Sequence, residues 1–303
     1  MSHGHGHQHH HHEPAQYGKA FAAGIGLNIL FVAVEAIYGF FSDSLSLLAD
    51  AGHNLSDVLG LIIAWAAVWL GKKLPTKKRT YGYKKSSVMA ALLNAIILLI
   101  AIGAIFLGAI QRFAHPEPVA GKTVMIVAVI GIVINTITAL LFMSGRKTDL
   151  NIRGAFLHMA ADALVSLGVV IAGAIILFTG WEWVDPVTSI IIAVVIFAGT
   201  WGLLREAADL SLDAVPAGVD AGAIKTYLEQ IPTVLNVHDL HIWGMSTTET
   251  ILTVHIVRSQ IEDNDQLLEK LEKELHDKFG IEHATIQIEK GTYVCGLAPD
   301  NKV

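Results

Sequence analysis

The chain has few charged residues and a single cysteine, and each shortage excludes a class of protein. Charged residues make up only 16% of its 303 residues and hydrophobic residues make up 53%, which is too apolar for an ordinary water-soluble domain. The lone cysteine, Cys295, cannot form an internal disulfide, so nothing requires an oxidising compartment. The N-terminus lacks the apolar core and cleavage site of a signal peptide. The composition therefore predicts an integral membrane protein.

Six apolar segments, each near the ~20 residues that a spanning helix needs, fill the first two thirds of the chain. They cover residues 18–41, 45–71, 86–111, 119–143, 152–179 and 186–204. An even number of spans places both termini on one side of the membrane. The loops after the second and fourth segments are rich in lysine and arginine, so the positive-inside rule places these loops, and both termini, in the cytoplasm.

The residues after 204 have a different composition and a different periodicity. They hold 17 acidic against 8 basic residues, whereas residues 1–204 hold 10 against 13. Their pattern predicts helices near 220–230 and 264–279, and strands near 234–243, 249–258 and 283–289. We expect a membrane all-α domain of six transmembrane helices (18–204), followed by a cytoplasmic α+β domain of αββαβ order (205–303).

One polar pair occurs twice inside the apolar segments, as His53-x-x-x-Asp57 in the second and His158-x-x-x-Asp162 in the fifth. A spacing of four places both members of a pair on one helical face. An ionisable side chain in hydrocarbon costs roughly 3 kcal/mol or more, so four at matched spacing indicate a site whose ligand offsets that cost. Two imidazoles and two carboxylates suit a divalent metal such as zinc in tetrahedral coordination. The two segments run antiparallel, so each histidine can approach the aspartate of the other segment.

Other interpretations of these polar residues remain open at this stage. The four could merely form interhelical hydrogen bonds. For six further residues we prefer interhelical hydrogen bonds or water contact to metal ligation: Asn28, Glu35, Asp50, Asn54, Asn94 and Asn135. An intramembrane metalloenzyme would need an open coordination position and typically a His-Glu-x-x-His motif, which the sequence lacks. A membrane metal sensor that carries no flux is a third interpretation.

The motifs resemble those of the cation diffusion facilitator family, particularly its bacterial zinc exporters, over nearly the whole chain. The resemblance rests on residues 44–57 (SLSLLADAGHNLSD), 81–83 (YGY), 158–162, 238–243 (HDLHIW) and 283–289 (HATIQIE). It implies a secondary transporter rather than an enzyme: a homodimeric antiporter that exchanges cytoplasmic zinc, or cadmium or cobalt, for external protons by alternating access. It also implies a metallochaperone-like cytoplasmic domain and a bacterial inner-membrane location, with no nucleic acid as partner and no catalytic cofactor.

Carried over residue by residue, the transport site of the family falls on His53, Asp57, His158 and Asp162, the same four that the spacing selects. In the family, a histidine at the second-span position accompanies a preference for zinc. Some relatives bind a further metal between the second and third spans, but residues 74–85 hold neither histidine nor aspartate, so we expect no such site. A family charge interlock would map to Lys85, or less readily Lys84, with Asp213.

In the cytoplasmic domain the resemblance implies metal ligands at His238, His255 and Glu289, with Cys295 as a fourth candidate. The residues themselves leave His238 open, because a regular strand would place it on the face opposite His241. Only a bulge or a late strand start would bring it to the polar face, and plain solvated side chains are the alternative for the whole set.

The first twelve residues contain seven histidines, which could be a purification tag or a natural leader. The interrupted His-Gly-His-Gly-His pattern favours a leader, so residues 1–17 are expected to be a disordered tail that collects metal at low affinity.

Overall fold

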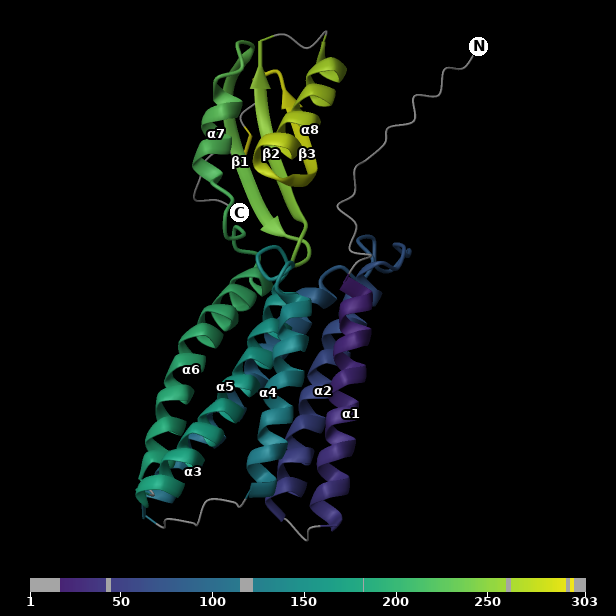
Figure 1. The fold of residues 1–303 in the computed structure, drawn as a ribbon. Coiled ribbons are helices and arrows are strands. Elements are labelled where there is room, and N and C mark those ends of the chain that lie inside the picture. The colour runs from purple at the N-terminus through teal and green to yellow at the C-terminus, as the bar shows by residue number, and fades with distance from the viewer. Residues whose placement is uncertain are drawn as a thin grey trace.

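The computed structural model describes residues 17–41, 45–114, 122–181, 183–259, 263–292 and 295–296. Many helical side chains, those of Asp50 and His53 among them, lie outside that description. Figure 1 shows an elongated bundle of long helices with a smaller domain at one end. The tail predicted for residues 1–17 lies almost wholly outside the described residues. The helices of the bundle are α1 (Tyr17–Phe41), α2 (Leu45–Gly71), α3 (Ser86–Ala114), α4 (Lys122–Phe142), α5 (Leu150–Thr179) and α6 (Val184–Ser211).

The six helices match the six predicted spans, and their outer surface is apolar. Ile100, Leu30 and Val195 are each more than half exposed in the protein alone, a surface that only lipid or another apolar partner can cover. Within the described residues, three stretches are by themselves long and apolar enough to cross a membrane: Lys19–Tyr38, Ser86–Gln111 and Met125–Phe142. Within the described residues of α2, a shorter apolar stretch runs from Asp57 to Gly71.

Helix α5 is the most connected helix of the bundle. It packs against α4 and α6 and also touches α2 and α3, while α1 packs on α2 and α4, and α3 packs on α6. Helix α6 continues to Ser211, beyond the apolar segment predicted to end at 204. Its last turns remain helical because Leu203, Ala207 and Leu210 recur at helical spacing and are buried in a cluster with residues of α3 and α5.

The C-terminal domain contains α7 (Ala221–Glu229), β1 (Val234–Gly244), β2 (Thr250–Arg258), α8 (Asn264–Phe279) and β3 (Ile281–Glu289), in the predicted αββαβ order. The sheet order is β1-β2-β3, with β1 antiparallel and β3 parallel to β2. Both helices contribute buried side chains to a single core with the sheet. Leu267, Leu271 and Leu275 form the buried stripe of α8, and Gly280, at a left-handed φ of 68°, ends that helix.

Candidate metal sites

Three of the four predicted transport-site residues lie together inside the bundle. Nε2 of His158 on α5 is 2.6 Å from Oδ1 of Asp57 on α2 and 3.7 Å from Oδ2 of Asp162, one turn along α5. The three side chains are 4–12% exposed, and one potential ligand atom from each lies within 4.8 Å of the others. We call these three residues the membrane cluster. A zinc ion at ~2.0 Å from each atom would need the ligand atoms to lie ~3.3 Å apart, a value between the two distances from His158.

The fourth residue, His53, lies on α2 one turn before Asp57. Helical spacing therefore places it on the same side of α2 as Asp57. Its side chain is outside the described residues, so its participation stays a prediction.

Small residues let three helices approach one another beside the membrane cluster. Gly154 lies one turn before His158 on α5, and a Cβ there would meet the Nδ2 of Asn94 on α3 at 2.6 Å. A Cβ at Gly60 on α2 would lie 3.2 Å from Oδ1 of the same Asn94 side chain. Glycine at these two positions thus leaves room for the side-chain amide of Asn94 on α3 between α2 and α5. Such close packing beside small residues is typical of membrane helices.

Asn28, Glu35 and Asn54 form interhelical hydrogen bonds, as predicted. The amide of Asn54 on α2 donates to Oε2 of Glu35 on α1 at 2.7 Å. The amide of Asn28 on α1 donates to Oγ1 of Thr138 on α4 at 3.4 Å. These bonds fix the helices around the membrane cluster.

A second group, which we call the C-terminal cluster, joins His238 on β1, His255 on β2, Glu289 at the end of β3, and Cys295. Nδ1 of His255 is 3.1 Å from Oε1 of Glu289 and 3.7 Å from Sγ of Cys295, and Nε2 of His238 is 3.6 Å from Oε2 of Glu289. Potential ligand atoms of all four lie within 4.8 Å of one another. Two imidazoles, a carboxylate and a thiol form a donor set that zinc accepts.

A bulge in β1 explains how His238 reaches this cluster. The register of β1 with β2 shifts between His238 and His241, and Asp239 within the shift has a left-handed φ of 51°. His238 is thereby buried opposite His255, whereas the His241 side chain is 41% exposed and its Nε2 lies 2.9 Å from Oδ1 of Asp239. The other carboxylate oxygen of Asp239 is 3.4 Å from Nε2 of His255 and can orient that ring.

Lys85 makes the contact with Asp213 that the resemblance implied. Its Nζ lies 2.5 Å from Oδ1 of Asp213 and donates to the carbonyl oxygens of Leu210 at the end of α6 and Gly244 at the end of β1, each at 3.0 Å. Lys84 is instead paired with Glu249. Lys85 therefore joins α3, α6 and the sheet.

Replacing Asp213 by asparagine is expected to change stability little, because exposed ion pairs contribute only ~0–1 kcal/mol and asparagine tolerates the left-handed φ of 59° at this position. Lys85→Met is expected to destabilise more, since the carbonyl oxygens of Leu210 and Gly244 also lose their donor. The thermal unfolding midpoints of the two purified variants test this order. An equal fall of the unfolding midpoint in both variants would show that the ion pair with Asp213 accounts for the whole stabilising effect of Lys85.

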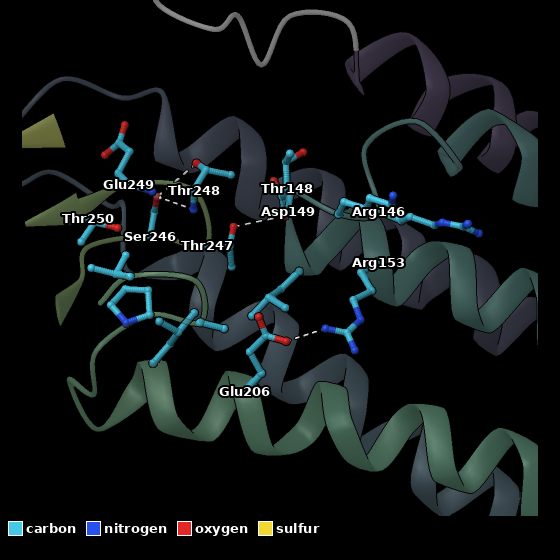
Figure 2. Close-up of a pocket in the computed structure, with 16 residues that line it drawn as sticks. Arg146, Thr148, Asp149, Arg153, Glu206, Ser246, Thr247, Thr248, Glu249 and Thr250 are labelled. Atoms are coloured by element: carbon cyan, nitrogen blue, oxygen red, sulfur yellow. Dashed lines mark hydrogen bonds and ion pairs between the residues drawn. The ribbon is translucent and has the colours of Figure 1, made fainter. Parts of the chain in front are cut away.

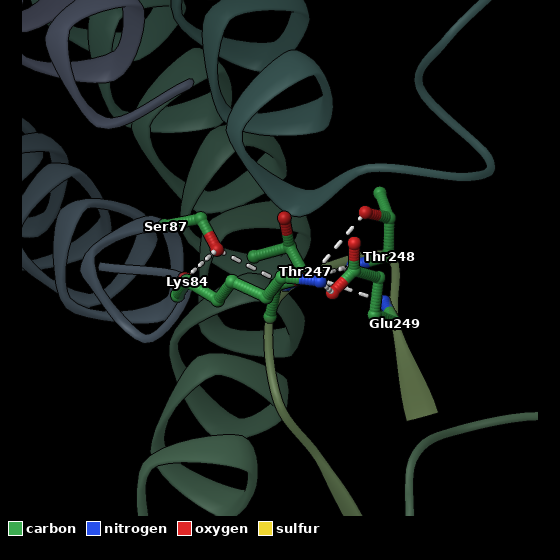
Figure 3. A network of polar contacts seen from close by, with 6 residues as sticks. Lys84, Ser87, Thr247, Thr248 and Glu249 are labelled. Carbon is green, nitrogen blue, oxygen red and sulfur yellow. Dashed lines mark hydrogen bonds and ion pairs between the residues drawn. The ribbon is translucent and has the colours of Figure 1, made fainter. Parts of the chain in front are cut away.

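Sequence reasoning missed the residues that join the two parts of the chain. The turn between β1 and β2 contacts the segments where α3 and α5 begin. Thr247 in this turn contacts Asp149 (Figure 2) and Ser87 (Figure 3). Glu249 contacts Lys84 (Figure 3). In the sequence these are ordinary polar residues of loops, and no spacing signals that they meet.

The chain matches known proteins along nearly its whole length. The profile of the cation efflux transmembrane domain matches residues 22–210, and that of the cation efflux protein cytoplasmic domain matches residues 216–291. The zinc transporter ZitB of Escherichia coli (strain K12) is 38% identical over 266 residues, covering 87% of this chain and 85% of that protein. The cadmium, cobalt and zinc/H(+)-K(+) antiporter of Bacillus subtilis (strain 168) is 37% identical over 264 residues, covering 86% of this chain and 85% of that protein.

A third relative, the metal cation efflux system protein CzcD of Cupriavidus metallidurans, is 36% identical over 277 residues, covering 91% of this chain and 88% of that protein. The first profile alone covers more than half of the chain, and each relative exceeds 30% identity over most of it. The chain, an integral multi-pass membrane protein, therefore belongs to the cation diffusion facilitator family of cation efflux proteins.

Proposed function

We propose that this protein exports divalent metal, chiefly zinc, from the cytoplasm in exchange for protons. The observation that carries the proposal is the membrane cluster, in which Asp57, His158 and Asp162 converge inside an apolar bundle. The relatives named for zinc, or for cadmium, cobalt and zinc, support the choice of metal and make cadmium and cobalt further candidates. His53 would complete a His2Asp2 tetrahedral site near the bilayer midplane.

The charge of the cluster favours a divalent cation as cargo. Two carboxylates in a low-dielectric interior are costly unless positive charge compensates them, and a doubly charged ion balances two aspartates. Nitrogen and oxygen donors in a tetrahedral set suit zinc, which has no geometric preference from its d electrons. Four protein ligands would leave no position for an activated water, which argues against a hydrolytic metalloenzyme.

Proton exchange follows from the chemistry of these ligands. Metal binds neutral imidazole and ionised carboxylate, so loading releases protons and protonation assists release of the metal. In the inward-open state the site would load zinc from the cytoplasm, and in the outward-open state external protons would displace it. One proton per zinc ion would move net positive charge outward, at ~2.3 kcal/mol per elementary charge for each 100 mV, whereas two protons would be electroneutral.

The remaining parts of the chain have roles consistent with export. Residues 18–204 would form the transport domain, with both termini in the cytoplasm of a bacterial cell and the bundle in its inner membrane. Residues 205–303 would bind metal at the C-terminal cluster and form the homodimer, and the name of the matching profile, a cytoplasmic domain, supports this placement. Residues 1–17 would collect metal, and the pair of Lys85 with Asp213 would hold the two domains together as a charge interlock.

Zinc flux into sealed proteoliposomes tests the proposal directly. With purified protein and an imposed pH gradient that supplies protons from the lumen, a zinc-sensitive dye inside the vesicles should report rapid uptake. The initial rate and the final ratio of luminal to external zinc should both fall when an ionophore collapses the pH gradient, because outward proton flow then no longer drives zinc inward.

The alternatives give different results in the same vesicles. A metal sensor would bind zinc without accumulation, and an intramembrane protease would give neither accumulation nor proton movement. Zinc that enters at the same rate with and without the proton gradient would contradict coupled exchange. Wild-type protein that binds zinc but moves none would contradict transport altogether.

A further inference from the structure

The turn between β1 and β2 is bonded to the starts of two transmembrane helices. The amide of Thr247 in this turn donates to Oγ of Ser87 at the start of α3, at 3.1 Å (Figure 3). The hydroxyl of the same residue donates to Oδ1 of Asp149, directly before α5, at 3.1 Å (Figure 2). Thr247 thus bonds to two helices through two different groups.

Asp149 fixes the beginning of α5. Its Oδ1 accepts a hydrogen bond from the backbone amide of Asn151 at 2.7 Å, the geometry by which a side chain caps a helix N-terminus. The side-chain amide of Asn151 (Nδ2) donates to the carbonyl oxygen of Ser87 at 3.0 Å. Burial raises the pKa of the Asp149 carboxyl, although its hydrogen bonds to Asn151 and Thr247 oppose that rise. The four residues therefore form a closed contact among α3, α5 and the turn, which we call the clasp.

The clasp lies between the two candidate metal sites along rigid elements. His158 follows the start of α5 by eight residues, which is ~12 Å along a helix. On the other side, β1 carries His238 and β2 carries His255, so the turn directly joins the two strands that supply the histidines of the C-terminal cluster. A movement of either strand that accompanies metal binding would reach α5 through Thr247 and Asp149.

The neighbouring contact of Lys84 with Glu249 is less suited to pass such a movement from the sheet to the transmembrane helices. Both of its side chains are more than one third exposed, and exposed ion pairs contribute little. The Thr247 to Asp149 bond ends on a half-buried carboxylate directly before the helix that bears two members of the membrane cluster.

We propose that Asp149 and Thr247 are positioning residues for transport, which couple the metal occupancy of the C-terminal cluster to His158 and Asp162 through α5. This inference rests on the proposed function of both clusters. It requires that removal of the Thr247 hydroxyl uncouples the two sites without removing a metal ligand.

A double-mutant cycle in the proteoliposome assay tests the clasp. The variants are Thr247→Val, which keeps the shape and removes the hydroxyl, His255→Ala, and the two combined. We expect Thr247→Val to lower the maximal zinc flux about 3- to 10-fold, with the half-saturating zinc concentration and the number of zinc ions bound per chain unchanged, because every ligand remains. The double variant should transport like Thr247→Val alone, because coupled residues are not additive.

Matched controls separate coupling from damage to the fold. Thr247→Ser should restore the flux, because it restores the hydroxyl. Thr248→Val changes the adjacent residue, whose hydroxyl interacts within the turn with Ser246, and should leave flux at the wild-type level. If Thr247→Val fails to fold, Asp149→Ala and its conservative counterpart Asp149→Asn take its place in the cycle.

Three results would overturn the clasp. In the first, the fold-losses of zinc flux in Thr247→Val and His255→Ala multiply in the double variant. In the second, His255→Ala has the wild-type flux. In the third, Thr248→Val loses as much flux as Thr247→Val. An absence of zinc flux in the wild-type protein would instead refute the proposed function, so the two failures are distinguishable.

Discussion

Zinc flux is expected to fall by at least about 100-fold when Asp57 or Asp162 is replaced by asparagine. Asparagine keeps the size of the side chain but cannot supply the negative charge that a divalent ion needs in the interior of the bundle. Changes to residues that merely orient a metal ligand cost about 10- to 100-fold in affinity or activity, so loss of a ligand should cost at least as much. Initial rates of zinc uptake into proteoliposomes, at matched protein incorporation, measure the effect.

The control for this pair is Asp209→Asn, the same chemical change on the exposed cytoplasmic end of α6. It should transport normally. Equilibrium zinc binding distinguishes lost affinity from lost movement, and the Asp57 and Asp162 variants should each bind one zinc ion fewer per chain. Normal flux in a folded Asp162→Asn variant would refute the membrane cluster as the transport site.

The geometry around Asp57 shows how much of the proposed transport site is predictable. Spacing alone selected the two helices and the face of each, because a period of 3.6 residues fixes which side chains lie in line. Their antiparallel order then brought His158 to Asp57, as the structure has it. The close approach that Gly60 and Gly154 allow to Asn94 was not predictable, since a glycine in an apolar segment has many possible packing partners.

The C-terminal domain shows a different limit. Alternating hydrophobicity predicted all three strands, yet it could not decide between His238 and His241. The answer depends on a bulge at Asp239, a non-glycine residue with positive φ, and no local sequence signal marks that conformation. The contacts of Thr247 with Ser87 and Asp149 join residues more than 95 positions apart, so only the tertiary fold reveals them.

Replacing His255 by alanine is expected to remove one bound zinc ion per chain while part of the flux remains. The imidazole lies at the centre of the C-terminal cluster, within 3.1 Å of Glu289 and 3.7 Å of Cys295, so its loss leaves the remaining donors too few for a closed site. Zinc that binds only the folded state stabilises it by about 2.7 kcal/mol at a hundredfold excess over its Kd. The zinc-dependent rise in the unfolding midpoint of the cytoplasmic domain should therefore disappear.

Thermal unfolding with zinc or with a chelator, together with metal analysis of the purified protein, measures this loss. His276→Ala is the matched control, because that histidine is exposed on α8 beside Asp277 and Glu282, away from the cluster. It should keep both the bound zinc and the stabilisation. An unchanged zinc content in His255→Ala would refute the C-terminal cluster as a metal site. The substitution leaves the ligands of the membrane cluster unchanged. Complete loss of zinc flux in a folded His255→Ala protein would therefore mean that the metal of the C-terminal cluster is required for transport and does not merely modulate it.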